Sequence, residues 1–167
     1  MAWQDQMSTI VRYIVNDVDS TNYTFSDERI ETSILVAAQL VSNEIDFVQT
    51  YTIDVEGGTI SPDPTVTATK DDDFINIISL RTGAIILGSE LKTQGFSAVR
   101  VSDGPSSIDM SRTMDGIKIL YDDVSSKYEE AKLQYKANGV VGEAILSPYS
   151  PGAHVVNGNY NHRGNYL

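Results

Sequence analysis

The sequence predicts a mainly α fold: a small helical bundle with a β-hairpin or short-strand insertion and an extended C-terminal arm. Apolar residues recur at spacings of three and four over several long stretches, as they do on one face of a helix. Alternation of apolar and polar residues, which is typical of strands, is confined to short segments. The last 20 residues hold two Pro, three Gly and four Asn without periodicity, so they cannot form a core of their own. We therefore expect a helical domain over residues 1–147 and an arm over residues 148–167.

Two helices are expected in the N-terminal part of the chain. Residues 4–16 place apolar side chains at helical spacing. A second helix is expected after Ser26, because Ser caps helix N-termini and because Asp27 and Glu28 lie in the first turn, where the helix dipole favours acids. An apolar stripe predicts that this helix continues to about residue 46: Ile30, Ile34, Ala38, Val41 and Ile45.

A short β segment is expected next. Residues 47–55 alternate between apolar and polar types, which predicts a half-buried strand. Glu56 and two glycines end it. Residues 59–64 fit either a loop or a short return strand, because Pro62 and Pro64 lack the N–H that a β-ladder requires.

A third helix is predicted from about Asp71 to Gln94. Its apolar residues occupy much of its circumference, so we expect it at the centre of the bundle. Gly83 and Gly88 each cost about 1 kcal/mol relative to Ala inside a helix, and close packing against another helix would offset this cost. Gly95 is the expected C-cap.

A β-hairpin is predicted from Ser97 to Met110, with its clearest pattern over residues 98–110. Val99 and Val101 alternate on one side, and Asp103, Gly104 and Pro105 form a turn signal.

A final helix is expected from about Ser111 to Ala137. Tyr121, Tyr128 and Tyr135 recur every seven residues along it. Other apolar residues fill the same sector: Ile117, Leu120, Val124 and Ala131. This pattern is typical of a packing seam in a core or between subunits.

Composition excludes several classes of function. The chain has 12 basic and 23 acidic side chains, a net charge of −11, which argues against a protein that grips nucleic-acid phosphates. Cys is absent, which excludes disulfides, thiolate nucleophiles and Cys-based metal sites. The N-terminal residues lack the basic region of a signal peptide, and no uninterrupted apolar stretch approaches 18 residues. We therefore expect a chain that has no membrane partner.

The residues between the first two predicted helices are the strongest candidate for a metal site. Asp17, Asp19 and Glu28 occupy positions 1, 3 and 12 of a possible calcium loop. Asn22 replaces the Gly that makes the sharp turn of an EF-hand. A polar connector closed by the Ser26 cap accounts for the same residues, and a calcium-binding helical regulatory protein remains the alternative.

Other candidate constellations are weaker. Asp71, Asp72 and Asp73 point in different directions on a helix and suit its positive end better than chelation. His154 and His162 lie in the arm with no acidic residue between them. We expect no catalytic residue, metal ligand or cofactor, and thus a protein that is not an enzyme. A small helical enzyme whose acids assemble only in three dimensions is the third possibility.

The arm carries aromatic and aliphatic residues that a purely solvating tail would lack. A disordered end is the alternative interpretation, but an extended arm of this length would reach roughly 65 Å and contact a neighbour. We expect partner or subunit contacts at residues of the hairpin and the arm: Val99, Val101, Ile108, Tyr149, Val155, Val156, Tyr160, Tyr166 and Leu167.

Two stretches together resemble a known protein family. The run from Tyr23 to Ile30, which opens a helix containing Ala37 and Ala38, is similar to the opening of the head-tail adaptor (head-completion or connector) proteins of tailed bacteriophages. Residues 99–111, with a turn at 103–105 and an Asp-x-Ser entry into a long helix, resemble the corresponding part of adaptor and neck proteins. The chain departs from many members of this family in its long tail and in its 47–66 segment.

The resemblance implies a structural virion protein made in the host cytoplasm and located in the neck. Such proteins form a homo-oligomeric ring, often of twelve subunits. The ring docks on the portal protein at the capsid vertex and joins it to a tail or neck protein. Double-stranded DNA then passes through the lumen as cargo and is not a ligand.

Overall fold

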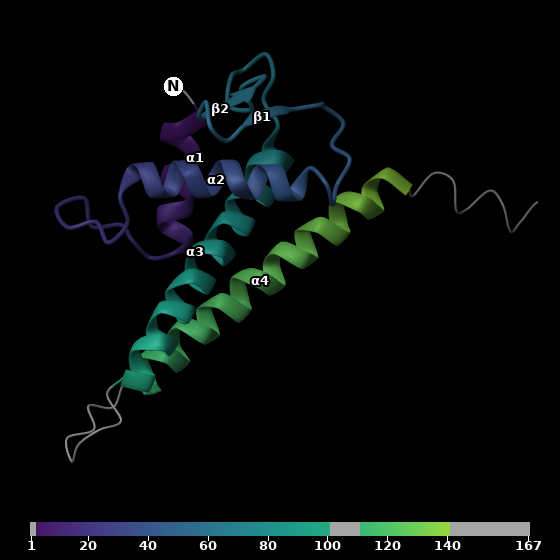
Figure 1. The fold of residues 1–167 in the computed structure, drawn as a ribbon. Helices are drawn as coiled ribbons and strands as arrows, with labels where there is room; N and C mark the ends of the chain where they lie inside the picture. Colours follow the sequence, from purple (N-terminus) through teal and green to yellow (C-terminus); the bar gives the residue numbers. More distant parts are fainter. Residues whose placement is uncertain (1–2, 101–110, 141–167) are drawn as a thin grey trace, which may run out of the picture. The chain divides into compact units, whose positions relative to one another are not determined.

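The computed structural model describes residues 3–100 and 111–140 (Figure 1). Its elements are α1 (Trp3–Ile14), α2 (Asp27–Val41), β1 (Thr52–Asp54), β2 (Thr59–Ser61), α3 (Asp72–Arg100) and α4 (Ser111–Val140). The predicted mainly α fold class is confirmed, since the strands form only a two-stranded sheet. The chain divides into two compact units, Met1–Lys132 and Leu133–Leu167. Within the second unit the structure describes only residues 133–140, which are the last part of α4.

Helix α3 is the core helix of the first unit, as predicted. It contacts both α1 and α2. Phe74, Ile78 and Ile86 on α3 are almost fully buried, together with Met7 of α1 and Ile34 of α2. The segment Asp72–Gly95 is long and apolar enough to cross a membrane, with a mean hydropathy of 1.3, but 56% of it is buried inside the protein. Burial of this extent is what a core helix shows.

Helix α2 begins as predicted but ends earlier. The Ser26 hydroxyl accepts a hydrogen bond from the Arg29 N–H at 3.3 Å, which confirms the cap. The helix stops at Val41 and not near residue 46. The Ser42 hydroxyl and the Asn43 amide both donate to the Gln39 carbonyl, so local side-chain bonds compete with the helical ladder. Ile45 is still buried, which is why the apolar pattern continues beyond the helix.

The β segment is shorter than expected. The strands β1 and β2 pair antiparallel with Ile53 opposite Ile60, so residues 59–61 do form a return strand. The prediction of a strand over residues 47–51 was wrong. Phe47 and Tyr51 instead pack around Phe74 of α3, with ring centroids 5.1 and 4.0 Å from it. Burial of three aromatic rings there outweighs two-stranded pairing, which is marginal by itself.

The glycines of α3 allow close packing, as predicted. A Cβ at Gly83 would lie 2.6 Å from Ile14 Cγ2 and 3.4 Å from Val124 Cγ1. A Cβ at Gly88 would lie 3.2 Å from the Tyr121 ring. Side chains of α1 and α4 thus contact the α3 backbone directly, which explains why glycine is used inside this helix.

Helix α3 continues where a hairpin was expected. It runs through Gly95 to Arg100, so Gly95 is not its C-cap and Ser97–Arg100 are helical. Extending a helix gains one hydrogen bond for each residue fixed, whereas an isolated hairpin is marginal in water. The rest of the predicted hairpin, including its turn, lies outside the described residues.

Helix α4 runs from Ser111 through Gly139 to Val140, slightly beyond the predicted end at Ala137. Within the first unit, two tyrosines of the predicted packing seam are buried or half-buried. Tyr128 is 1% exposed, and Tyr121 lies half-buried against Gly88. Leu120 was expected in the same sector, but it is 44% exposed. In the second unit, Tyr135 is half-buried and Leu133 is exposed.

Candidate functional site

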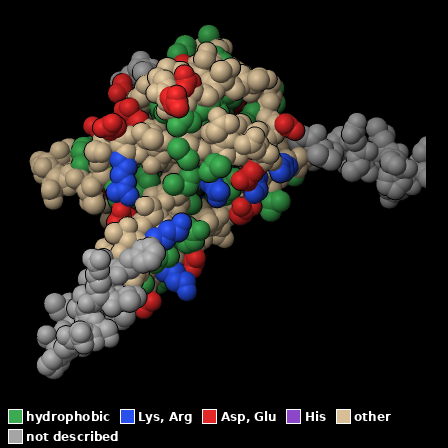
Figure 2. Space-filling view, in the orientation of Figure 1, with side chains coloured by type: hydrophobic (Ala, Val, Ile, Leu, Met, Phe, Trp, Pro, Cys, Tyr) green, Lys and Arg blue, Asp and Glu red, His purple; other side chains and the backbone are tan. Residues whose placement is uncertain are grey.

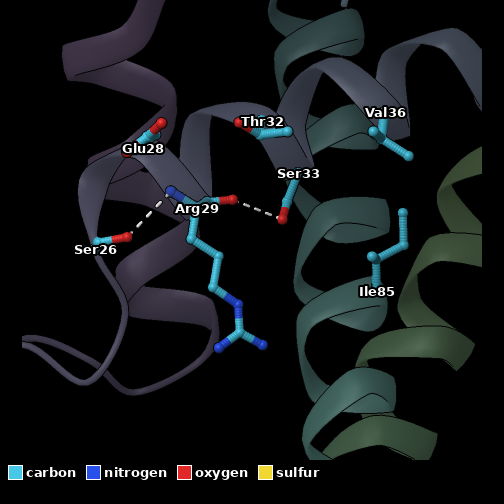
Figure 3. A pocket seen from close by; sticks show the side chains of 7 residues that line it. All are labelled: Ser26, Glu28, Arg29, Thr32, Ser33, Val36 and Ile85. Atoms are coloured by element: carbon cyan, nitrogen blue, oxygen red, sulfur yellow. Dashed lines mark hydrogen bonds between the residues drawn. The ribbon is translucent and has the colours of Figure 1, made fainter.

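Helices α2, α3 and α4 form a groove on the first unit. It consists of two hollows of about 370 and 350 Å³ that share Ile85. The first hollow lies between α2 and α3 (Figure 3), and its lining residues are Ser26, Glu28, Arg29, Thr32, Ser33, Val36 and Ile85. The second lies between α3 and α4 and is lined by Arg81, Ala84, Ile85, Gly88, Leu91, Lys92 and Tyr121.

The floor of the groove is apolar because α2 carries more apolar residues than its buried face can hold. Val36 is 37% exposed and Leu40 is 43% exposed, one helical turn apart. Figure 3 shows Val36 of α2 facing Ile85 of α3 across the first hollow. Leu91 and the Tyr121 ring continue this apolar lining in the second hollow.

Two of the three hydroxyl groups that line the first hollow, those of Ser26 and Ser33, have backbone partners. The Ser26 hydroxyl caps α2, and the Ser33 hydroxyl donates to the Arg29 carbonyl at 2.7 Å (Figure 3). Neither is placed beside a His or an acid that would activate it as a nucleophile among the described residues. These two hydroxyls therefore stabilise helix α2.

Three cations border the apolar floor. Arg29 binds Glu90 at 2.9 Å and lies 4.9 Å from the centre of the Phe25 ring. Arg81 lies 5.1 Å from the centre of the Tyr128 ring. Lys92 is exposed and forms no ion pair with any residue that the structure describes. Glu28 also lines the first hollow and Arg81 lies 3.9 Å from Glu44, so the groove carries charges of both signs, and Lys92 is the one of these three cations that no described carboxylate pairs.

A second polar cluster fastens α4 to the turn after α2. The Tyr128 hydroxyl donates to Glu44 at 2.9 Å, and Lys132 donates to the same Glu44 oxygen at 3.0 Å. The hydrogen bond from Lys132, helped by Tyr128 and by the charge of Arg81, lowers the pKa of Glu44 against the opposing effect of burial.

Both partners of Glu44 hold their protons more tightly than usual. Burial, followed by the hydrogen bond to Glu44, raises the pKa of Tyr128 to about 12. The hydrogen bond to Glu129, followed by that to Glu44, raises the pKa of Lys132. A phenol that remains neutral to high pH and a carboxylate that remains charged suit a structural link and not proton transfer at neutral pH.

The candidate calcium loop is organised around a buried arginine. Arg12 of α1 contacts the Asp17 and Asp27 carboxylates at 2.6 Å each and donates to the Phe25 carbonyl at 3.0 Å. Asp17 also accepts from the Thr24 N–H at 2.8 Å and the Phe25 N–H at 3.2 Å. The carboxylate at the first calcium position therefore already has a cation and two backbone donors.

Of the remaining candidate calcium ligands, Glu28 lies in the first turn of α2 and Asp19 is used in a local turn. Asp19 accepts from both the N–H and the hydroxyl of Thr21, and these bonds lower the pKa of Asp19. Within residues 3–100 and 111–140, no three His, Asp or Glu side chains lie close enough together to hold a metal ion. The geometry is that of a polar connector.

The acidic residues at the start of α3 have the role that the sequence predicted. Asp71 precedes the helix and accepts from the Phe74 N–H at 2.9 Å, while Tyr51 donates to its other oxygen at 2.9 Å. Asp72 binds Lys70 at 2.8 Å. These carboxylates cap and charge the helix N-terminus.

The structure places only one of the sequence-predicted contact residues. Val99 lies in α3, so the prediction that it lies in a hairpin strand was wrong. The others fall outside the described residues: Val101, Ile108, Tyr149, Val155, Val156, Tyr160, Tyr166 and Leu167.

Sequence reasoning missed the groove and the Arg12 cluster. The pair Val36 and Leu40, four residues apart and outside the predicted buried stripe of α2, was the available signal for an exposed apolar strip. An arginine in the last turn of α1, five residues before an aspartate, was the signal for the buried ion pair.

No family model, curated protein or solved structure matches this chain.

Proposed function

We propose that this chain is a structural virion protein, a ring-forming head-tail adaptor that docks on the portal of a tailed bacteriophage and joins the capsid vertex to the tail. The proposal rests on the resemblance of residues 23–38 and 99–111 to that family. The capped helix that opens at Ser26 is consistent with it.

The observation that carries the proposal is the apolar surface that the isolated subunit exposes on its helices. Helix α4 buries Val124 and Tyr128, yet Ile119 is 69% exposed and Leu120 is 44% exposed on the same helix. The α2 residues Val36 and Leu40 add a second exposed strip. Exposed apolar residues on two helices of a small unit favour a subunit that contacts other chains.

The charge of the chain agrees with a lumen through which DNA passes. A net charge of −11 repels phosphates and opposes the counterion release that supplies non-specific DNA affinity. An acidic wall would leave DNA free to slide, with the double helix as cargo.

Co-expression with the portal protein of the same virus tests this proposal. Native mass spectrometry should show an integral multiple of the 18.3 kDa subunit, bound to the portal, and electron microscopy should show a ring. Deleting residues 148–167 should leave the helical circular dichroism nearly unchanged while it weakens binding to the portal. A chain that remains a monomer with and without the portal would contradict the adaptor function.

A further inference from the structure

We infer that the groove between α2, α3 and α4 receives the tip of the β1–β2 hairpin from a second copy of this chain. The inference rests on the proposed ring-forming function and names the contact by which neighbouring subunits would meet. It is carried by the complementary chemistry of two surfaces on the first unit.

The groove offers an apolar floor and, in its second hollow, one cation without a carboxylate partner among the described residues. Its floor of Val36 and Ile85 excludes water only when another apolar side chain covers it. Lys92 at its border has no anionic partner among the described residues, so an incoming carboxylate would find a cation there. Figure 2 shows apolar side chains grouped near the middle of the face in view, with Lys, Arg, Asp and Glu side chains around them.

The hairpin end of the first unit has the opposite charge. Residues 46–69 contain four carboxylates and no Lys or Arg. At the tip, Val55 is 37% exposed and the neighbouring Glu56 is exposed, with no ion pair among the described residues. One apolar and one anionic side chain therefore stand next to each other, as the groove requires.

The tip is held in shape before any contact forms. The Gly57 N–H donates to the Asp54 carboxylate at 2.8 Å, and Gly58 adopts a positive φ of 68°. A Cβ at Gly57 would collide with the same Asp54 carboxylate. A preformed tip loses little conformational freedom on binding, which favours affinity.

A subunit does not reach its own groove with this tip. Tyr51, at the base of the hairpin, stacks on Phe74 in the first turn of α3. Val55 is four residues further on, about 13 Å of extended chain. Ile85, at the centre of the groove, lies eleven residues along α3 from Phe74, about 17 Å. The tip would fall short, whereas a neighbouring copy has no such limit.

The contact joins two different patches and is therefore heterologous. Repetition of a heterologous contact gives a closed ring when the rotation between subunits closes, and a filament when it does not. The same pairing would thus account for a ring built from one kind of chain.

Charge reversal at both surfaces tests the pairing. Lys92→Glu and Glu56→Lys should each weaken self-association about five- to tenfold in sedimentation velocity, because each places like charges together. The double variant should return close to the wild-type value, since the pair is restored with reversed sign. Asp5→Lys, which changes an exposed carboxylate of α1 by the same charge, is the matched control and should leave self-association unchanged.

Crosslinking supplies a second measurement that does not depend on affinity. Because the chain has no Cys, one engineered thiol is the only thiol present. A mixture of Glu56→Cys and Lys92→Cys proteins should give a covalent dimer with a short bismaleimide reagent, whereas Asp5→Cys mixed with Lys92→Cys should not. Circular dichroism confirms that each variant is folded.

The outcomes separate this inference from the proposed function. Rings that bind the portal but show neither the charge-swap rescue nor the specific crosslink would overturn the hairpin–groove contact and leave the adaptor function standing. A specific crosslink in open filaments that ignore the portal would support the contact and contradict the adaptor function. A wild-type chain that is monomeric at all concentrations, without the crosslink, would overturn the contact.

Discussion

The hydroxyl of Tyr128 donates a hydrogen bond to Glu44 at 2.9 Å, joining residues that are 84 positions apart in the sequence. Glu44 follows the last turn of α2, and Tyr128 lies at the centre of the packed part of α4. This bond and the Lys132 ion pair both connect α4 to the turn after α2.

Tyr128→Phe should lower the free energy of unfolding by about 1–2 kcal/mol, because Glu44 loses a donor while the buried ring is kept. Urea denaturation followed by circular dichroism measures the change. Tyr13→Phe removes the hydroxyl of a tyrosine that is 72% exposed and should have almost no effect. Equal losses in the two variants would show that the Tyr128 bond contributes nothing specific.

The same tyrosine should make stability fall at alkaline pH. The pKa of Tyr128 is raised to about 12 from a usual value of 10.0, so the folded state favours the neutral phenol. Its contribution is complete below pH 10 and is lost as the pH rises towards 12. Wild type and Tyr128→Phe should therefore converge in stability over this range, and a constant difference from pH 8 to 12 would contradict the assignment.

Gly83→Ala should destabilise the protein by about 1–3 kcal/mol, although Ala is the better helix former. The added Cβ would meet Ile14 Cγ2 at 2.6 Å. Gly116→Ala is the control on α4, where a Cβ meets nothing within 4 Å, and it should stabilise by about 0.5–1 kcal/mol. Adding Ile14→Ala to Gly83→Ala removes the obstructing methyl, so it should cost less than the two single changes combined. Thermal melts of the variants measure these changes in stability. If Gly83→Ala alone stabilised the protein, the close contact would be refuted.

Arg12→Met should cost about 3–5 kcal/mol, because it leaves the buried Asp17 carboxylate without its cation. Arg29→Met, which removes a much more exposed arginine and its Glu90 pair, should cost less than about 1 kcal/mol. The combination of Arg12→Met with Asp17→Asn should recover part of the loss, since no buried charge remains. Chemical denaturation measures both changes in the free energy of unfolding. If Arg12→Met lowers it no more than Arg29→Met does, the buried pair is unimportant.

Calcium should not bind the 17–28 loop with micromolar affinity, because Asp17 is already neutralised by Arg12 and because Asn22 lacks the conformational freedom of Gly. Isothermal titration calorimetry of the metal into the protein measures this directly. Micromolar binding that disappears in Asp17→Asn would favour the calcium-regulated alternative over the structural role.

Features that are determined by residues close together in the sequence could be predicted better than features that require residues far apart in the sequence to meet. The Ser26 cap and the glycines of α3 were found because a hydroxyl before acids and a Gly within an apolar helix each have a local physical meaning. The end of α2 was placed too late because Ile45 continues the apolar stripe after the backbone has turned.

The hairpin prediction near Val99 erred because alternation over a few residues does not reveal that a helix extends into them. The sequence could signal the exposed strip of Val36 and Leu40 but not the groove that it helps to form. Val36 and Ile85 are 49 positions apart, and their meeting depends on how α2 crosses α3. The ion pair of Arg12 was overlooked for a similar reason, since an arginine in a helix is usually taken for a solvent-facing residue.

The buried Arg12 also has a consequence for the evolution and engineering of the chain. By binding Asp17 at one end of the connector and Asp27 at the other, it fixes the two ends of the loop independently of the residues between them. The exposed stretch around Ser20 can then lengthen at a small entropic cost, about 0.6 kcal/mol for each doubling of its length. An epitope or a fluorescent label inserted there would mark the protein without disturbing the helices that flank the loop.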